Sequence, residues 1–210
     1  IKVKRKTIRD HRNYGVLDIT GIITKSSNVG VTKLALSLPE NSIRDTFYSF
    51  GLGQSTGTGF PGESAGILPN YAKWNPINLA TMSYGYGIAV TPLQLAQAYN
   101  VFASYGLKRP ISMLKQETEL EAERVMPERV AKQVIAMLET VTQRGGTGTR
   151  AQVPSYRVAG KTGTVHRTSK QGGYDDDRYA AVFAGMAPAS KPRLVCVVIV
   201  DDPKGEQYYG

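Results

Sequence analysis

The spacing of apolar residues predicts helices in the first two thirds of the chain. Four apolar residues recur at the i, i+3, i+4 and i+7 positions of one helix face between Asn28 and Leu38: Val31, Leu34, Ala35 and Leu38. Similar patterns predict a short helix over 41–50 and a longer one from Pro127 to the break at Gly145. Another helix starts with Thr91-Pro92 as its cap and first residue. Residues 51–76 are rich in Gly, Pro, Ser and Asn, which predicts a long irregular loop.

The last sixty residues change to a period of two or to continuous apolar runs. Three strands are expected there: Tyr156–Val165, Tyr179–Met186 and Leu194–Val200. The third is apolar throughout, which is typical of a strand buried on both faces. The connection over 166–178 is long and charged, and we expect it to be mobile. Helices first and strands last favour an α+β domain, with an antiparallel sheet flanked by helices.

Composition sets limits on this picture. With 210 residues the chain holds one medium domain or at most two small ones, and 41% hydrophobic residues are enough to form a core. No apolar run approaches the ~20 residues needed to cross a bilayer. The single cysteine, Cys196, excludes a disulfide framework within the chain and offers no metal-site spacing. We therefore expect no metal and no cofactor.

The net charge of +9 is concentrated at the start of the chain. The first twelve residues carry six basic side chains and one acidic side chain, a net +5. Such a cluster fits an anionic partner, such as nucleic acid or anionic lipid, or a solvated arm attached to a preceding part of a longer protein. No aromatic interleaving or nucleic-acid motif accompanies it, so we favour the arm and expect no nucleic-acid partner.

A short polar motif on the first late strand, Lys161-Thr162-Gly163-Thr164, has a composition suited to binding. Glycine in a strand removes a side chain where another backbone can approach. Lysine adds a positive charge, and the threonines add hydroxyl donors. These groups would suit a substrate that lies along the strand and ends in a carboxylate. The alternative is a kink in an edge strand.

Ser26-Ser27-Asn28, at the start of the first predicted helix, forms an S-x-N motif that by itself is better explained by helix capping than by function. The pair of motifs is more specific. S-x-N opening a helix, followed more than a hundred residues later by K-T-G-T on a strand, resembles two of the three signature motifs of the serine penicillin-recognising enzymes. This resemblance implies a penicillin-binding transpeptidase fold for the chain.

Further stretches are similar to class B penicillin-binding proteins, and the resemblance covers essentially all 210 residues. The stretches of the general class are Lys25–Gly30, Ser83–Gly87, Thr91–Leu95 and Gly145–Gly148. Those similar to the septal, division-specific members are Arg12–Gly15, Gly51–Gly53 and Asp201–Gly210. The third motif of the family, S-x-x-K, carries the nucleophilic serine and its lysine base, and we find none that fits. The resemblance therefore implies that residues 1–210 are the C-terminal portion of a transpeptidase domain, whose nucleophile and early strands precede Ile1.

The resemblance also implies roles for the motif residues in acyl transfer through a serine ester. Ser26 would relay a proton to the leaving amine, and Asn28 would hold the substrate amide. Lys161 would favour the anionic tetrahedral state and the substrate carboxylate. The hydroxyls of Thr162 and Thr164 would bind that carboxylate, and the backbone N–H of Thr164 would form one arm of the oxyanion hole.

Four further residues are candidates for substrate binding. Gly163 belongs to the strand motif, and Tyr86 belongs to the Ser83–Gly87 stretch. Tyr208 and Tyr209 directly follow the last predicted strand, where we expect them to form an aromatic wall beside the cleft.

Three hypotheses for function remain open at this point. The first is a septal peptidoglycan D,D-transpeptidase that cross-links stem peptides and is trapped by β-lactams. It would be the periplasmic domain of an inner-membrane-anchored protein with division-machinery membrane proteins as partners. The second is a relative with the same motifs, such as an elongation-type transpeptidase or a β-lactamase-like protein. The third is a non-enzymatic basic binding module, in which both motifs are structural.

Overall fold

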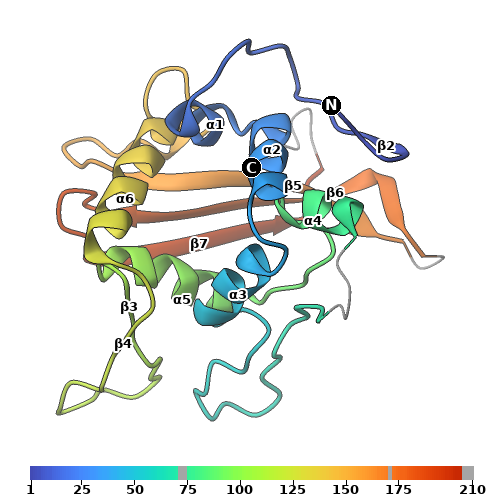
Figure 1. The fold of residues 1–210 in the computed structure, drawn as a ribbon. Helices are drawn as coiled ribbons and strands as arrows, with labels where there is room; N and C mark the ends of the chain where they lie inside the picture. Colours follow the sequence, from blue (N-terminus) through green and yellow to red (C-terminus); the bar gives the residue numbers. More distant parts are fainter. Residues whose placement is uncertain (71–74, 170–171, 205–210) are drawn as a thin grey trace.

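The computed structural model describes residues 1–70, 75–169 and 172–204, and these form helices followed by an antiparallel sheet (Figure 1). The first part contains a small hairpin and five helices: β1 (Lys2–Val3), β2 (Lys6–Thr7), α1 (Ile19–Lys25), α2 (Asn28–Ser37), α3 (Ser42–Ser49), α4 (Pro76–Met82) and α5 (Pro92–Ala103). A second small hairpin, a long helix and a 3₁₀ turn follow: β3 (Leu107–Lys108), β4 (Glu123–Arg124), α6 (Glu128–Thr142) and η1 (Thr149–Ala151). No described helix is both long and apolar enough to cross a membrane.

The main sheet has three antiparallel strands in the order β5-β6-β7. They are β5 (Ala159–Thr168), β6 (Tyr174–Ala187) and β7 (Leu194–Asp201). The predicted α+β class, with helices before three late antiparallel strands, is confirmed. The predicted helices at 28–38, 41–50, after Thr91 and after Pro127 are also confirmed, to within a few residues at their ends.

Two expectations for the sheet are wrong. Residues 166–178 are not one long connection, because β5 and β6 continue as a hairpin in which His166 pairs with Tyr179 and Thr168 with Tyr174. The apolar strand β7 is not buried on both faces, since it lies at the sheet edge and the Leu194 residue is 72% exposed. Apolar composition shows that a strand can be buried, but only the rest of the fold decides what covers it.

The core lies between the sheet and the helices α5 and α6; in Figure 1, α6 crosses in front of the strands and α5 lies next to β7. Ile135 and Leu138 of α6 pack against Ala159 of β5 and Met186 of β6. These positions follow the apolar stripe of α6, so one helix face meets the sheet while the opposite face stays solvated. The first residues of β5 are thereby held rigidly, directly before the Lys161 motif.

Two short helices were not predicted from the sequence. The first, α1, begins at Asp18, whose carboxylate accepts a hydrogen bond from the Gly21 N–H at 2.7 Å. The second, α4, begins after Asn75 with proline at its first turn, the arrangement that identifies α5. Both helices flank the cleft described below, so their positions matter for the site.

The loop before α4 is held by one buried side chain. Gln94 is fully buried, and its Nε2 donates to the carbonyls of Gln54 and Ala65 at 2.7 Å each. Its Oε1 accepts from the Thr91 N–H at 2.9 Å, which closes the capping box of α5. A single amide therefore joins the start of α5 to two distant points of the irregular loop.

Candidate active site

The two motifs meet in one cleft, although 135 residues separate Ser26 from Lys161. The Lys161 ammonium donates a hydrogen bond to the Ser26 Oγ at 2.9 Å. A cavity of about 280 Å³ surrounds this contact, between the start of α2 and strand β5. Among its lining residues are Ser26, Asn28, Ser83, Tyr84, Lys161, Thr162, Gly163 and Thr164. The fold therefore brings Ser26, Asn28 and Lys161 together in one cleft.

The S-x-N segment is a tight junction between two helices. Ser26 ends α1 in the left-handed conformation, with φ of 55°, which is uncommon for a residue other than glycine. Ser27 then caps α2, because its Oγ accepts from the Gly30 N–H at 2.8 Å. Asn28 is the first residue of α2. This order places Ser26 and Asn28 on either side of a buried capping serine.

The junction requires close packing of α1 on α2. A Cβ atom at Gly30 would lie 2.6 Å from Ile22 Cγ1 of α1, which is closer than real side chains approach. A side chain at this position would therefore push the helices apart and move Ser26. Next to the junction, the Lys25 Nζ donates to the Gly145 carbonyl at 2.6 Å and ties the end of α1 to the loop before β5.

Lys161 is the group in this cleft with the most strongly altered pKa. Burial disfavours the ammonium form and lowers the pKa of Lys161 to about 8, from an ordinary value of 10.5. Its Nζ also donates to the Thr162 carbonyl at 2.8 Å. The lysine is thus a positive charge in a partly desolvated place, where electrostatic attraction to an anion is stronger than at the surface.

The other residues of the β5 motif, Thr162, Gly163 and Thr164, differ in the contacts that hold them. The Thr162 hydroxyl shares a 2.7 Å hydrogen bond with the hydroxyl of Thr147, so the preceding loop orients it. Thr164 pairs with Ala181 across the sheet and lines the cleft. A Cβ atom at Gly163 would meet only the Cβ of Val182, at an ordinary distance of 3.7 Å. The packing of the protein itself therefore does not demand glycine at this position.

Aromatic residues lie at one end of the cleft. The Tyr86 hydroxyl accepts from the His166 N–H at 3.3 Å, and the Tyr86 ring meets those of Tyr84 and Tyr174 edge to face. Of these, Tyr84 lines the cavity, whereas Tyr86 contacts the Tyr84 ring and is not among the lining residues. Tyr84 was therefore the missed cleft residue of the Ser83–Gly87 stretch. The expected wall of Tyr208 and Tyr209 lies outside the described residues.

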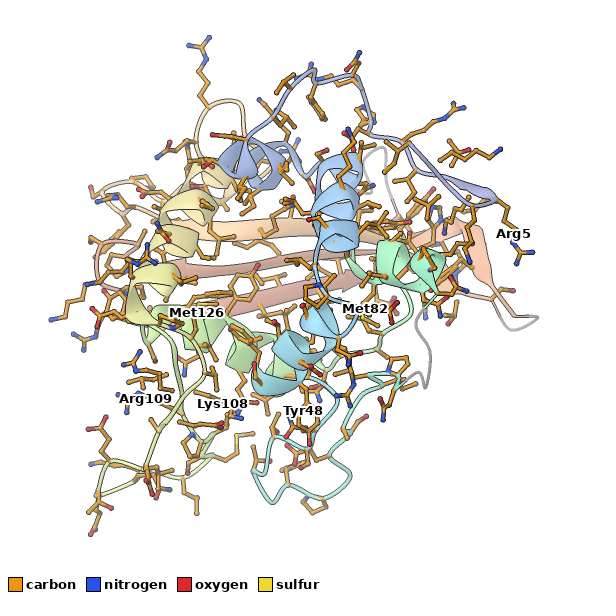
Figure 2. All side chains as sticks on the ribbon, viewed as in Figure 1. Arg5, Tyr48, Met82, Lys108, Arg109 and Met126 are labelled. Atoms are coloured by element: carbon orange, nitrogen blue, oxygen red, sulfur yellow. The ribbon has the colours of Figure 1, made fainter. Side chains whose placement is uncertain are left out.

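The chain does contain one Ser-x-x-Lys spacing, at Ser112 and Lys115, but its surroundings do not suit a nucleophile. Ser112 is exposed in the loop between β3 and β4, and its Oγ donates to the Leu114 carbonyl two residues away. Figure 2 shows Lys108 and Arg109, just before this loop, far from the hairpin that carries Arg5 and from α2. The motif is therefore remote from the cleft.

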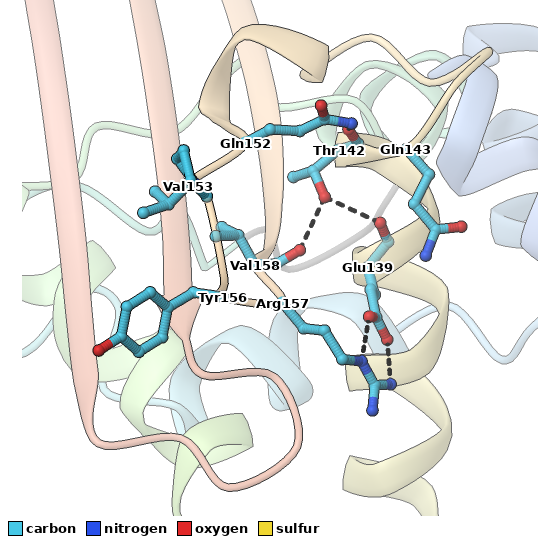
Figure 3. Close-up of a pocket in the computed structure, with 9 residues that line it drawn as sticks. Glu139, Thr142, Gln143, Gln152, Val153, Tyr156, Arg157 and Val158 are labelled. Atoms are coloured by element: carbon cyan, nitrogen blue, oxygen red, sulfur yellow. Dashed lines mark hydrogen bonds and ion pairs between the residues drawn. The ribbon is translucent and has the colours of Figure 1, made fainter.

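A larger cavity, of about 500 Å³, lies between α6 and the segment that leads into β5 (Figure 3). Its one carboxylate, Glu139, is held by two hydrogen bonds from Arg157, at 2.5 and 2.6 Å. The hydroxyl of Thr142 donates to the Val158 carbonyl at 2.7 Å. These polar groups already satisfy one another, so the smaller cleft at Lys161 remains the better candidate for chemistry. No group of three or more metal-ligating side chains occurs among the described residues.

Comparison with known proteins agrees with the resemblance in the motifs. Residues 2–210 match the family described as penicillin binding protein transpeptidase domain. Over 209 residues the chain is 44% identical to the peptidoglycan D,D-transpeptidase FtsI of Escherichia coli K12. It is 40% identical, also over 209 residues, to the probable peptidoglycan D,D-transpeptidase PenA of Neisseria gonorrhoeae. All of this chain is covered in both, but only 35% and 36% of the length of those proteins.

A solved structure shows the same fold. The transpeptidase domain of penicillin-binding protein 3 from Burkholderia pseudomallei superposes with a TM-score of 0.88 at 41% identity. The match covers 92% of this chain and 59% of that domain. The chain thus spans about a third of the length of these two curated relatives and somewhat more than half of a solved transpeptidase domain.

Proposed function

We propose that this chain, which belongs to the penicillin-binding protein transpeptidase family, is part of a septal peptidoglycan D,D-transpeptidase of the FtsI type. The observation that carries the proposal is the direct contact between Lys161 and Ser26 in a cleft that also holds Asn28. Two motifs far apart in the sequence meet there with the residue types that serine acyl transfer needs.

The proposed reaction begins with attack by a serine on the D-Ala–D-Ala amide of a stem peptide. The serine oxygen bonds to the carbonyl carbon, its proton passes to the protein, and the C–N bond breaks to release D-alanine. Ser26 relays a proton to the departing amine, and Asn28 holds the peptide amide. An amine of a second stem peptide then attacks the ester carbonyl and forms the cross-linking amide. The ester C–O bond breaks, and the serine oxygen recovers a proton from that amine.

The strand motif supplies the charge that this reaction requires. Lys161 attracts the terminal carboxylate, with the hydroxyls of Thr162 and Thr164 as hydrogen-bond donors, and Thr164 provides one backbone N–H to the oxyanion. The position of Gly163 supports this arrangement, because the sheet leaves room for a Cβ there. Glycine at that point keeps the strand accessible to the backbone of a peptide.

The chain is proposed to be the C-terminal portion of its transpeptidase domain, with the nucleophilic serine on a segment before Ile1. Support comes from the partial coverage of the solved domain and from the remote position of Ser112. We further propose a periplasmic location on an inner-membrane anchor, with stem peptides as substrates and β-lactams as inhibitors. Division-machinery membrane proteins are the proposed partners.

Labelling of the full-length protein with a fluorescent penicillin tests this function. We expect one covalent adduct, which competes with unlabelled penicillin and maps by mass spectrometry to a serine outside residues 1–210. The Ser112→Ala variant is the matched control and should label like the wild type, since Ser112 is remote from the cleft. Absence of any adduct, or an adduct on Ser26 or Ser112, would contradict the proposal.

A further inference from the structure

Asp10 is a carboxylate in the most basic stretch of the chain, and it contacts the S-x-N segment directly. Its Oδ2 accepts a hydrogen bond from the Ser27 hydroxyl at 2.6 Å, and its Oδ1 accepts from the Val29 N–H at 2.9 Å. Neither contact is part of a motif, because Asp10 lies seventeen residues before Ser27. The carboxylate therefore connects the segment that follows the β1–β2 hairpin to the first turn of α2.

We propose that Asp10 is a positioning residue, which sets the geometry of Ser26 and Asn28 by holding Ser27 between them. This proposal rests on the proposed acyl-transfer function of the cleft. Ser27 is 3% exposed, and its Oγ donates to Asp10 while accepting from the Gly30 N–H. With both bonds made, the side chain has one orientation, and the backbone on each side of it is fixed.

The capping of α2 is shared between the two residues. The first N–H groups of a helix have no partner within the helix and favour a nearby negative charge. Ser27 takes the N–H of Gly30, and Asp10 takes that of Val29. Loss of Asp10 would leave the Val29 N–H and the Ser27 hydroxyl to find new partners, so the turn that carries Asn28 would loosen.

Ser26 depends on this support because of its backbone conformation. A left-handed serine persists only where its surroundings hold it. On its N-terminal side it is held by α1, through hydrogen bonds from the N–H groups of Ser26 and Ser27 to the carbonyls of Ile23 and Ile22. On its C-terminal side the restraint is the Asp10–Ser27 pair. The Ser26 Oγ that accepts from Lys161 is thus placed from both directions.

Asp10 is itself anchored by packing. Ile8, two residues earlier, is 4% exposed and lies in a cluster with Val3 and Ala80, against which Val29 and Tyr84 pack. The carboxylate therefore approaches α2 from a segment that Ile8 anchors by packing, rather than from a free arm. A buried apolar anchor and two hydrogen bonds converge on the same helical turn, which is the arrangement expected of a positioning group.

The test is the kinetics of β-lactam acylation in the full-length protein. For Asp10→Ala we expect the first-order acylation rate constant to fall about 10- to 100-fold, since a displacement of ~1 Å in a reacting group costs about that much. The dissociation constant of the initial complex should change less than threefold. Asp10→Asn keeps the size and one acceptor oxygen and should recover part of the rate.

Two further variants separate positioning from general stability. Thr91→Ala removes a side-chain cap at the start of α5, which does not line the cleft, and should lower the melting temperature while the acylation rate constant stays within twofold. Asp10→Ala and Ser27→Ala should be non-additive when combined, because they break the same hydrogen bond. If Asp10→Ala does not fold, Asp10→Asn and Ser27→Ala carry the test.

The proposal is overturned if the folded Asp10 and Ser27 variants acylate within twofold of the wild type, or if Thr91→Ala slows acylation as much. A wild-type protein that forms no acyl-enzyme would overturn the proposed function, and this role of Asp10 with it. Normal acylation of the wild type and of the Asp10 variants alike would overturn only the positioning role.

Discussion

The two outer strands of the sheet, β5 and β7, differ in burial, and the difference is the opposite of what their compositions suggest. Strand β5 contains the polar Lys161 motif, yet it begins with the fully buried Ala159 and packs along α6. Strand β7 is almost entirely apolar, yet Val198 is 50% exposed and Val200 is 48% exposed. Polar residues are therefore held by neighbours on one edge, while apolar residues lie open on the other.

The difference indicates what each edge is for. The polar groups of β5 have partners within this chain, such as Ser26 and Thr147, so that edge is already organised as a binding surface. An apolar outer strand with unpaired backbone groups is a surface that proteins ordinarily cover. We therefore expect the full-length protein to cover β7, in agreement with the proposed position of this chain within a larger domain.

The largest effect is expected on the β5 side. Replacing Lys161 by Ala removes a partly desolvated charge from the cleft, and the acylation rate constant for a β-lactam should fall about 10²–10³-fold, as for loss of an oxyanion-hole donor. Lys33→Ala is the control, because Lys33 is exposed on α2 and does not line the cleft. If the acylation rate constant of Lys161→Ala falls less than fivefold, the β5 edge does not need the Lys161 charge to react with the β-lactam.

A stability measurement tests the β7 side. In the full-length protein, Val198→Lys should lower the free energy of unfolding by about 2 kcal/mol, the cost of exposing or charging a covered valine. Denaturant unfolding would measure this, with Thr168→Lys on β5 as the control, for which we expect less than about 0.5 kcal/mol. Equal small effects at both positions would mean that β7 remains a free edge.

The pH dependence should separate binding from stability at Lys161. Because its pKa is about 8, the ammonium is present below pH 7 and largely lost by pH 9, so affinity for a carboxylate-bearing β-lactam should fall about tenfold over that range. The free energy of unfolding should change in the opposite direction. The folded-state pKa is below the ordinary 10.5, so wild-type stability relative to Lys161→Met should rise between pH 8 and 10.5.

The smallest effect is expected at Gly163. Alanine there meets only the Val182 Cβ at 3.7 Å, so Gly163→Ala should raise the free energy of unfolding by about 0.4–1 kcal/mol through the unfolded state. The same methyl group would narrow the approach to β5 and slow acylation severalfold. A variant that is more stable and equally reactive would show that no peptide backbone comes close at this point.

The local features of the fold could be predicted from the sequence. The apolar stripe of α6 and the Thr91-Pro92 cap of α5 each predict a helix from residues that are close together in the sequence. The same signals are present for α1, with Asp18 before Ile19, Ile22 and Ile23, and for α4, with Asn75 before Pro76. Those two helices were missed because each has only seven residues, too short for a clear periodic pattern.

The remaining errors have non-local causes. Strands β5 and β6 pair beyond Val165 because backbone ladders form regardless of how polar the side chains are, as Thr168 and Tyr174 show. The exposure of β7 depends on what covers the sheet, which no segment encodes by itself. In the cleft, the meeting of Ser26 with Lys161 was expected only through a family resemblance. Asp10 was missed because an acid within a basic stretch carries no motif.

The single amide of Gln94 has a consequence for how the protein opens. It caps α5 and also holds the loop at Gln54 and Ala65, and Gly66 packs so closely that a Cβ would lie 2.8 Å from the Gln94 Oε1. The start of the helix and the irregular loop therefore cannot loosen separately. In hydrogen exchange, the amides of Gln94 and Ile67 should become accessible in one concerted event, so that this loop behaves as part of the folding unit of α5.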